Sequence, residues 1–303
     1  MLKLNDSKSI MMQPKVSIII PTYNRSEDLK RAINSVIRQT YTNWELIIVD
    51  NYSVDETDQV VKSYLDPRIF LFKVKNEGVI AVSRNLGITK SSGEYIAFLD
   101  SDDWWKPNKL ALSVLALISG ADIVYHDLVR VQKSNQKWNF KKLKTRKLGI
   151  NQFDDLLEYG NAILNSSVVL KKELIFKVGM LNQDRKFIAW EDFDFWLRIA
   201  KGNFKFKRLS ECLGFYWQVG GNLSNDKRSL EIFKAILETY SLDLRDGKTP
   251  PWIHFERAKI QSRSRDYESA IQNLKLIEIR NLRFYLKGSI LKLLIFLKIF
   301  LKK

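Results

Sequence analysis

The sequence has little cysteine and histidine and begins without an apolar signal-peptide segment, and each of these features excludes some classes of protein. Cys212 is the only cysteine among 303 residues, so no intramolecular disulfide can form, and a reducing compartment is expected. The two histidines, His126 and His254, stand in no nucleophile or metal-ligand pattern, so we expect both to be structural. The first 15 residues lack the long apolar stretch of a signal peptide, which predicts a cytoplasmic protein.

Acidic residues are scarce in the second half of the chain. Residues 1–140 hold 18 Lys and Arg against 16 Asp and Glu, whereas residues 141–303 hold 32 against 18. This asymmetry predicts an anionic partner for the second half, either nucleic acid or a membrane surface. Zinc-finger spacing and RNP-like aromatic motifs are both lacking, so we expect no nucleic-acid partner and favour the membrane.

The first half of the chain alternates short apolar runs with segments of helical spacing. Runs expected as strands are Val16–Pro21, Trp44–Val49, Arg68–Phe72, Tyr95–Leu99 and Asp122–Tyr125, with Ser166–Leu170 later. Segments expected as helices are Glu27–Arg38, Asp55–Tyr64, Val79–Ile88, Pro107–Ile118, Asn151–Tyr159 and Phe193–Ala200. Such alternation predicts right-handed βαβ units and an α/β fold with a mainly parallel sheet covered on both faces.

Three polar clusters follow three of these strands: residues 22–25, 50–53 and 100–103. Ligands of parallel sheets bind beyond the carboxyl ends of the strands. We therefore expect the three clusters to converge on one crevice.

The cluster at 98–105, FLDSDDWW, places three carboxylates within four positions. If extended geometry continued past the strand, Asp100 and Asp102 would point to the same side as two hard oxygen donors, which suits Mg²⁺ or Mn²⁺. A solvated acidic turn, or a helix N-cap before Pro107, is the structural alternative for so common a pattern.

Five motifs in this order resemble those of glycosyltransferase family 2: VSIIIPTYNR (16–25), WELIIVDNYSVDET (44–57), NEGVIAVSRNLGI (76–88), GEYIAFLDSDDWWKP (93–107) and WEDFDFWLRI (190–199). The resemblance covers about residues 15–220. It implies the GT-A fold of nucleotide-sugar transferases, so we expect a catalytic domain over 1–225. Beyond about Asp226 the pattern becomes mostly helical, which predicts a helical C-terminal region over 226–303.

The resemblance also implies roles for residues of the donor site. Asp102 corresponds to the direct metal ligand for Mn²⁺ or Mg²⁺, Asp100 to a residue facing the ribose and the metal, and Asp103 to one orienting the donor sugar or its neighbours. The remaining nucleotide-sugar residues are expected to be Pro21, Thr22, Tyr23, Asp50, Arg84 and Ser101.

Three of these residues have structural alternatives. Asp50 could accept the N3–H of uracil or form an Asx-turn within DNYS. Tyr23 could border the uridine or pack on the next helix. Arg84 could meet the diphosphate, or could brace Asp100 or its helix.

The motif WEDFDFWLRI places two acids at the start of a helix. By resemblance, Asp192 is the general base that deprotonates the acceptor hydroxyl, and Glu191 helps to hold the acceptor. The structural alternative is that acids at this position only complement the helix dipole.

The sequence departs from the family at residues 214–224, GFYWQVGGNLS. Family members often carry an Arg and a His there that touch the diphosphate, whereas this chain has Trp217 and Gln218. Capture of the diphosphate by this loop is therefore in doubt.

The last segment, residues 281–303, holds six Lys and Arg and no acid, and its longest fully apolar stretch is Leu293–Leu297. A bilayer span needs about 20 apolar residues. The pattern favours a helix lying at an anionic membrane surface, with docking on the domain or on a partner as the alternative.

Together these features predict an inverting, metal-dependent hexosyltransferase at the inner face of a bacterial membrane. The expected donor is a UDP-sugar carrying glucose or galactose. The expected acceptor is a lipid-linked sugar of the undecaprenyl-diphosphate type, in O-antigen or capsule repeat-unit assembly. The rival functions are a nucleotide-sugar-forming nucleotidyltransferase, which should carry a Gly-rich basic loop where this chain has PTYNR, and a non-catalytic assembly partner.

Overall fold

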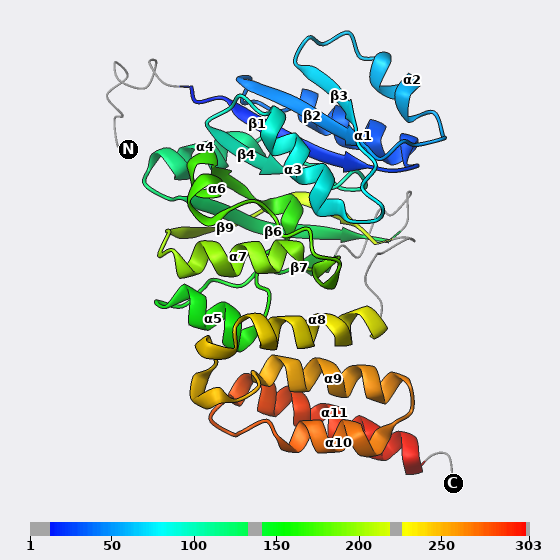
Figure 1. Ribbon diagram of the computed structural model, residues 1–303, viewed down its shortest axis with the longest axis vertical. Helices are drawn as coiled ribbons and strands as arrows, with labels where there is room; N and C mark the ends of the chain where they lie inside the picture. Colours follow the sequence, from blue (N-terminus) through cyan, green and yellow to red (C-terminus); the bar gives the residue numbers. More distant parts are fainter. Residues whose placement is uncertain (1–12, 133–140, 219–225, 301–303) are drawn as a thin grey trace. The chain divides into compact units, whose positions relative to one another are not determined.

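The computed structural model describes residues 13–132, 141–218 and 226–300. The chain forms two compact units (Figure 1). The first unit comprises Met1–Lys147 and Ile163–Gly221, and the second comprises Leu148–Ala162 and Asn222–Lys303. The expected boundary lay between residues 225 and 226 and did not separate residues 148–162 from the first part of the chain.

The first unit is built on a sheet of strand order β3-β2-β1-β4-β8-β6-β9-β5, with β7 paired to β6. Its strands are β1 Val16–Thr22, β2 Trp44–Asp50, β3 Ile69–Lys73, β4 Tyr95–Phe98, β5 Trp104–Trp105, β6 Ile123–Val131, β7 Lys141–Leu143, β8 Val169–Lys171 and β9 Phe206–Trp217. β1, β2 and β4 are buried along their whole length, which explains their almost continuous apolar sequence.

The sheet is parallel in its first half and mixed in its second. β3, β2, β1 and β4 run parallel, as the βαβ pattern predicted, and the register pairs Thr22 with Asp50. β8 then pairs antiparallel with both β4 and β6, and β5 pairs antiparallel with β9. The expected α/β architecture is confirmed, and the antiparallel pairs were not foreseen.

Helices of the first unit lie on both faces of the sheet (Figure 1). They are α1 Ser26–Ile37, α2 Thr57–Lys62, α3 Ile80–Lys90, α4 Lys109–Ile118, α6 Lys172–Val178 and α7 Glu191–Lys201. One continuous core joins α1 and α4 to alternate strand positions such as Ile18 and Leu46. On the opposite face α3 approaches Ile19, and Trp196 of α7 lies 6.4 Å from Phe98 between ring centroids. Since consecutive strand residues face opposite sides, the sheet is buried between two helical layers.

The second unit is helical within the residues described. Its helices are α5 Gln152–Tyr159, α8 Asp226–Thr239, α9 Pro251–Arg263, α10 Tyr267–Lys275 and α11 Leu282–Phe300. Trp252 on α9 anchors it: the indole nitrogen donates to Leu157 O at 2.8 Å, and the ring meets Phe233 edge-on. None of the helices in the described ranges combines the length and apolar character needed to span a bilayer.

The surroundings of His126 and His254 favour the neutral form of both imidazoles. His126 is fully buried on β6, where burial and the nearby Lys109 lower the pKa of its imidazole to about 3. Burial likewise lowers the pKa of His254, whose Nδ1 pairs with Asn273 Oδ1 at 3.1 Å. Neither environment favours the cationic form.

Candidate active site

The guanidinium of Arg84 joins the acidic turn after β4 to the acidic start of α7. Arg84 lies on α3 and is 4% exposed. Its Nη2 donates to Asp100 Oδ1 at 2.7 Å, and its Nη1 donates to Glu191 Oε1. Burial opposes the charged form of Arg84, but Asp100 and Glu191 outweigh it and raise its pKa above the usual value. Of the roles expected for Arg84, this structure shows the contact with Asp100. Contact with the diphosphate stays a prediction.

The acids 100–103 lie in a turn, which corrects the expected strand geometry. β4 ends at Phe98, and Asp103 N donates to Asp100 O at 3.0 Å, so the chain reverses here. Asp100 and Asp102 therefore owe their positions to the turn and to their partners rather than to strand alternation. Ser101 is buried within this turn.

Asp103 points into the protein. It is 1% exposed, and its Oδ1 accepts from Trp217 N on β9 at 3.0 Å. Burial, followed by the charges of Asp102 and Asp100, raises the pKa of Asp103 well above its usual range. Its observed contact is with a neighbouring strand, which ties the acidic turn to the end of β9.

Asp192 lies in the first turn of α7, beside the buried Glu191. Burial raises the pKa of Asp192 to about 7, with Glu191 adding to the rise and Arg84 opposing it. Its Oδ1 accepts from Phe193 N at 2.7 Å. Ala189, just before this helix, adopts φ = 70°, a left-handed conformation that costs a non-glycine residue energy. A carboxylate with a pKa near neutrality is suited to general-base chemistry.

Several buried polar atoms have no hydrogen-bond partner within the described part of the chain, and those at this site include Thr22 Oγ1, Arg84 Nε, Asn165 Oδ1 and Glu191 Oε2. Asn165 also donates from Nδ2 to Asp100 Oδ1 at 3.1 Å, and Glu191 binds Arg84, so three of these four atoms belong to the Arg84 network. Buried polar atoms are usually paired, so a polar ligand bound at this site could supply the partners that these atoms lack.

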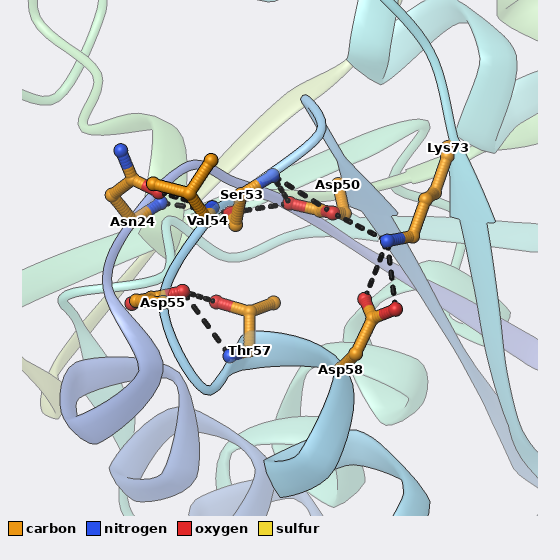
Figure 2. Close-up of polar contacts among 8 residues, drawn as sticks. All are labelled: Asn24, Asp50, Ser53, Val54, Asp55, Thr57, Asp58 and Lys73. Atoms are coloured by element: carbon orange, nitrogen blue, oxygen red, sulfur yellow. Dashed lines mark hydrogen bonds and ion pairs between the residues drawn. The ribbon is translucent and has the colours of Figure 1, made fainter.

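The loops after β1 and β2 are joined by side-chain hydrogen bonds (Figure 2). Asn24 N donates to Ser53 Oγ and Val54 N donates to Asn24 Oδ1, both at 2.8 Å. Asn24 and Tyr52 both adopt positive φ, 48° and 56°. With the pairing of Thr22 and Asp50, these bonds bring the first two polar clusters together as the strand order predicted.

Asp50 is fully buried at the end of β2 (Figure 2). Its carboxylate accepts from Ser53 N at 3.1 Å and lies 3.5 Å from Lys73 Nζ. The bond to Ser53 spans three residues, one more than an Asx-turn, so Asp50 fastens the DNYS loop by a longer side-chain bond. Recognition of uracil by Asp50 stays a prediction.

Pro21, Thr22 and Tyr23 continue from β1 to the site edge. Pro21 and Thr22 are buried, and Tyr23 is 54% exposed. Exposure of this ring argues against the alternative that Tyr23 packs on α1. The phenol is available at the edge where the first two polar clusters meet.

Sequence reasoning missed Arg25, although it stands in the motif PTYNR. Its Nη1 lies 3.0 Å from Asp102 Oδ2, so the first and third polar clusters also meet. Its position straight after a buried strand was the available signal. Asn165 and Ser166 were missed as well, because they contact the acidic turn from about 65 residues further along the chain and no motif indicated this contact.

Trp217 and Gln218, at the family's Arg and His positions, are occupied by contacts at the end of β9. Trp217 packs near Trp104, with ring centroids 6.4 Å apart. Gln218 Oε1 accepts from Arg130 Nε, and Gln218 N donates to Val131 O at 2.9 Å. Residues 219–224 of the same segment lie outside the described residues.

The donor set of the acidic turn fits a divalent cation that shares its ligands with a phosphate. In the described ranges no group of three or more His, Cys, Asp or Glu side chains is arranged to hold a metal ion. Mg²⁺ in proteins commonly uses one or two carboxylates and completes its shell with substrate phosphates and water. Asp102 already has a cation against it, the guanidinium of Arg25, which shows that the turn favours positive charge.

Comparison with known proteins identifies the class. Residues 17–168 match the model of glycosyl transferase family 2, which is half of the chain. A UDP-Glc:alpha-D-GlcNAc-diphosphoundecaprenol beta-1,3-glucosyltransferase of Escherichia coli, WfgD, is 33% identical over 189 residues, which covers 62% of this chain and 70% of that protein. This chain therefore belongs to glycosyltransferase family 2.

Other relatives place the chain among bacterial surface-polysaccharide members. A putative teichuronic acid biosynthesis glycosyltransferase of Bacillus subtilis, TuaG, is 27% identical over 230 residues, covering 71% of this chain and 83% of that protein. The chain spans only 16% of an uncharacterised glycosyltransferase of Rickettsia bellii, to which it is 48% identical over 111 residues, 36% of this chain.

Solved structures confirm the GT-A fold. Staphylococcus aureus TarS 1–349 in complex with UDP-GlcNAc superposes with a TM-score of 0.59 at 17% identity, covering 90% of this chain and 79% of that one.

Proposed function

We propose that this glycosyltransferase transfers a hexose, glucose or galactose, from a UDP-sugar to a lipid-diphosphate-linked sugar, with inversion at the anomeric carbon. The product would be a repeat unit of O antigen or capsular polysaccharide. The activity of the E. coli relative, which its name gives as glucosyl transfer to GlcNAc-diphosphoundecaprenol, supports both substrate classes.

One observation carries the proposal: Arg84 holds the acidic turn after β4 beside the carboxylates at the start of α7. The turn carries the donor-binding acids, and α7 carries a carboxylate whose pKa is raised to about 7. The donor phosphates and the acceptor hydroxyl would thus meet between the acidic turn and α7, which Arg84 holds next to each other.

Asp192 would take the proton from the acceptor hydroxyl as its oxygen attacks the anomeric carbon. The new glycosidic bond forms on the face opposite UDP, the bond to the UDP oxygen breaks, and UDP departs with that electron pair. Glu191 has a buried Oε2 available to accept from an acceptor hydroxyl. Asp102, with Asp100 beside it, would hold Mn²⁺ or Mg²⁺, which supplies positive charge to the leaving diphosphate.

The second unit supports a place at the inner face of a bacterial membrane. Leu286, Ile290, Leu293, Phe296 and Phe300 on α11 are all more than half exposed. The helix also carries Lys and Arg without any acid, so its apolar side chains can enter the headgroup region while its cations contact anionic lipid. Peripheral attachment would bring the enzyme to a lipid-linked acceptor.

Hexose transfer to a synthetic GlcNAc-diphosphate lipid, with UDP-glucose and UDP-galactose tested separately, checks the proposal. Asp192→Asn should lower turnover at least about 100-fold, the scale of a general base, and should bind UDP as the wild type does. Glu173→Gln, an exposed carboxylate on α6, is the matched control and should keep full activity. Normal turnover in Asp192→Asn would refute the assignment, and UDP binding without transfer to any acceptor would favour the non-catalytic partner.

A further inference from the structure

Two arginines, Arg25 and Arg31, form a closed ring of contacts with Asp28 and Asp102 that includes the backbone oxygen of Asp102. Arg25 Nη1 lies 3.0 Å from Asp102 Oδ2 and 3.3 Å from Asp28 Oδ2. Arg31 Nη2 donates to Asp28 Oδ1 at 2.7 Å and to the backbone oxygen of Asp102 at 2.9 Å. The ring thus surrounds the expected metal ligand with two cations.

Two aromatic rings lie against the guanidinium of Arg31. The guanidinium carbon of Arg31 lies 4.4 Å from the ring centroid of Trp104 and 4.9 Å from that of Trp217. Two cation–π contacts and two hydrogen bonds fix Arg31 as part of the scaffold. Arg25 contacts the carboxylates of Asp28 and Asp102, and its side chain is one quarter exposed.

We propose that Arg25 is the phosphate-binding cation of this enzyme and that it replaces the Arg and His that the family often carries where this chain has Trp217 and Gln218. The inference rests on the proposed use of a metal-chelated UDP-sugar. Before the donor binds, Arg25 neutralises Asp102. With the donor bound, Asp102 would hold the divalent cation in place of the guanidinium, and Arg25 would bind the diphosphate while it keeps its contact with Asp28.

Charge and geometry support this exchange. A guanidinium is always protonated and matches phosphate oxygens with paired N–H donors, so it binds diphosphate better than most groups. Arg25 already lies against the carboxylate that the phosphates and the cation would share, which places it within reach of the leaving group. Trp217 and Gln218 cannot perform this role, since neither side chain carries a charge.

Two binding measurements on the full chain test the proposal. Mn²⁺ alone is titrated and followed by the electron paramagnetic resonance signal of the free ion, and UDP is titrated with Mn²⁺ present by calorimetry. Arg25→Ala should bind Mn²⁺ alone more tightly, by about 3-fold or more, because the competing cation is gone. The same variant should bind UDP about 10- to 100-fold more weakly, the effect of losing one charged hydrogen-bonding partner, and should bind uridine unchanged.

Opposite shifts for Mn²⁺ and UDP separate this role from a structural one. If Arg25 only shaped the acidic turn, Arg25→Ala would weaken both ligands, and that result would overturn the proposal, as would unchanged UDP affinity. Arg25→Lys keeps the charge without the planar fork and should fall between Ala and wild type. Arg38→Ala removes an exposed arginine from the far end of α1 and should change neither affinity. A wild type that binds no UDP with Mn²⁺ present would refute the proposed function, and this inference with it.

Discussion

Arg84 is the residue on which the geometry of the site depends most. Taking a charged group out of water costs several kcal/mol, and the guanidinium of Arg84 is tolerated at 4% exposure because carboxylates contact two of its nitrogens. The dependence is mutual. Glu191 is equally buried, and its Oε1 pairs with the guanidinium of Arg84.

Replacing Arg84 by Met should therefore lower the free energy of unfolding by about 3–5 kcal/mol, because a buried carboxylate loses its cation. Urea unfolding followed by circular dichroism measures the change. The double variant Arg84→Met, Glu191→Gln should recover at least about 1 kcal/mol of that loss, since a neutral amide tolerates burial better. Equal stability of Arg84→Met and wild type would show that the bridge contributes nothing.

The pKa of Asp192 sets the pH at which the proposed reaction runs. Burial raises this pKa to about 7, and a base must be unprotonated to act. Turnover at saturating donor should rise with pH, level off above about pH 7, and fall about tenfold per unit below about pH 6. UDP binding measured at each pH shows whether the acidic limb belongs to the donor site, where burial raises the pKa of Asp102 to about 6. A plateau that extends below pH 5 would contradict the role of Asp192.

At the scale of elements, the close approach of α3 to β1 places Arg84. A Cβ added at Gly87 would lie 2.5 Å from Ile19 Cγ2, on a stiff branched side chain that is fully buried. Because Gly87 has no side chain, α3 can lie this close to β1. Arg84 stands on the same helix, so this close packing helps to place its guanidinium beside the acidic turn.

Gly87→Ala should therefore destabilise the protein by about 1 kcal/mol or more, although alanine normally favours a helix by about that amount over glycine. In the Ile19→Ala background the obstructing methyl is absent, so the same Gly87→Ala change should become neutral or stabilising. Thermal unfolding of the four proteins of this cycle decides the matter. Destabilisation of similar size in both backgrounds would show that Ile19 is not the obstacle.

Elements with local signals were predictable from sequence, and those held by distant partners were not. The four parallel strands β1 to β4 are buried or half-buried. Their apolar runs, separated by segments of helical spacing, predicted them from the sequence. β9 was missed because Phe206–Trp217 alternates irregularly and its parallel pairing with β6 contains register shifts. β5 was missed because two residues carry no periodicity, and their pairing partner lies about 110 residues away.

The candidate site divides in the same way. Asp50, Asp100, Asp102 and Asp192 could be proposed from the sequence because each stands at the end of a strand or the start of a helix within a recognisable motif. The partners that orient these acids, such as Arg25, Asn165 and Ser166, come from other loops. Only the folded chain brings them to the turn. The buried orientation of Asp103 likewise follows from β9, which the sequence did not predict.

At the scale of the whole molecule, the prediction concerns attachment to lipid. Leu293 and Leu297 are 60% and 47% exposed on a helix rich in lysine. Replacing both by Ser should weaken binding to phosphatidylglycerol vesicles at least about tenfold, because each buried leucine contributes more than about 1 kcal/mol. Flotation of the protein with vesicles measures the loss.

Two exposed leucines of the first unit, Leu65 and Leu115, provide the matched control when replaced by Ser, and binding should then be unchanged. Wild-type binding should also fall as salt rises or when the vesicles contain only zwitterionic lipid. If the α11 variant floats as well as the wild type does, the helix docks on protein rather than on lipid.

The central claim is that acids from separate loops bind one metal-chelated sugar nucleotide. The most direct measurement of it is the calorimetric titration of UDP into the wild type and into Asp102→Asn, with Mn²⁺ and with EDTA. The account predicts that the wild type binds UDP at least about tenfold more tightly with Mn²⁺ than with EDTA, and that Asp102→Asn loses this difference. Equal affinity in Mn²⁺ and EDTA, or a metal effect that survives in Asp102→Asn, would contradict it.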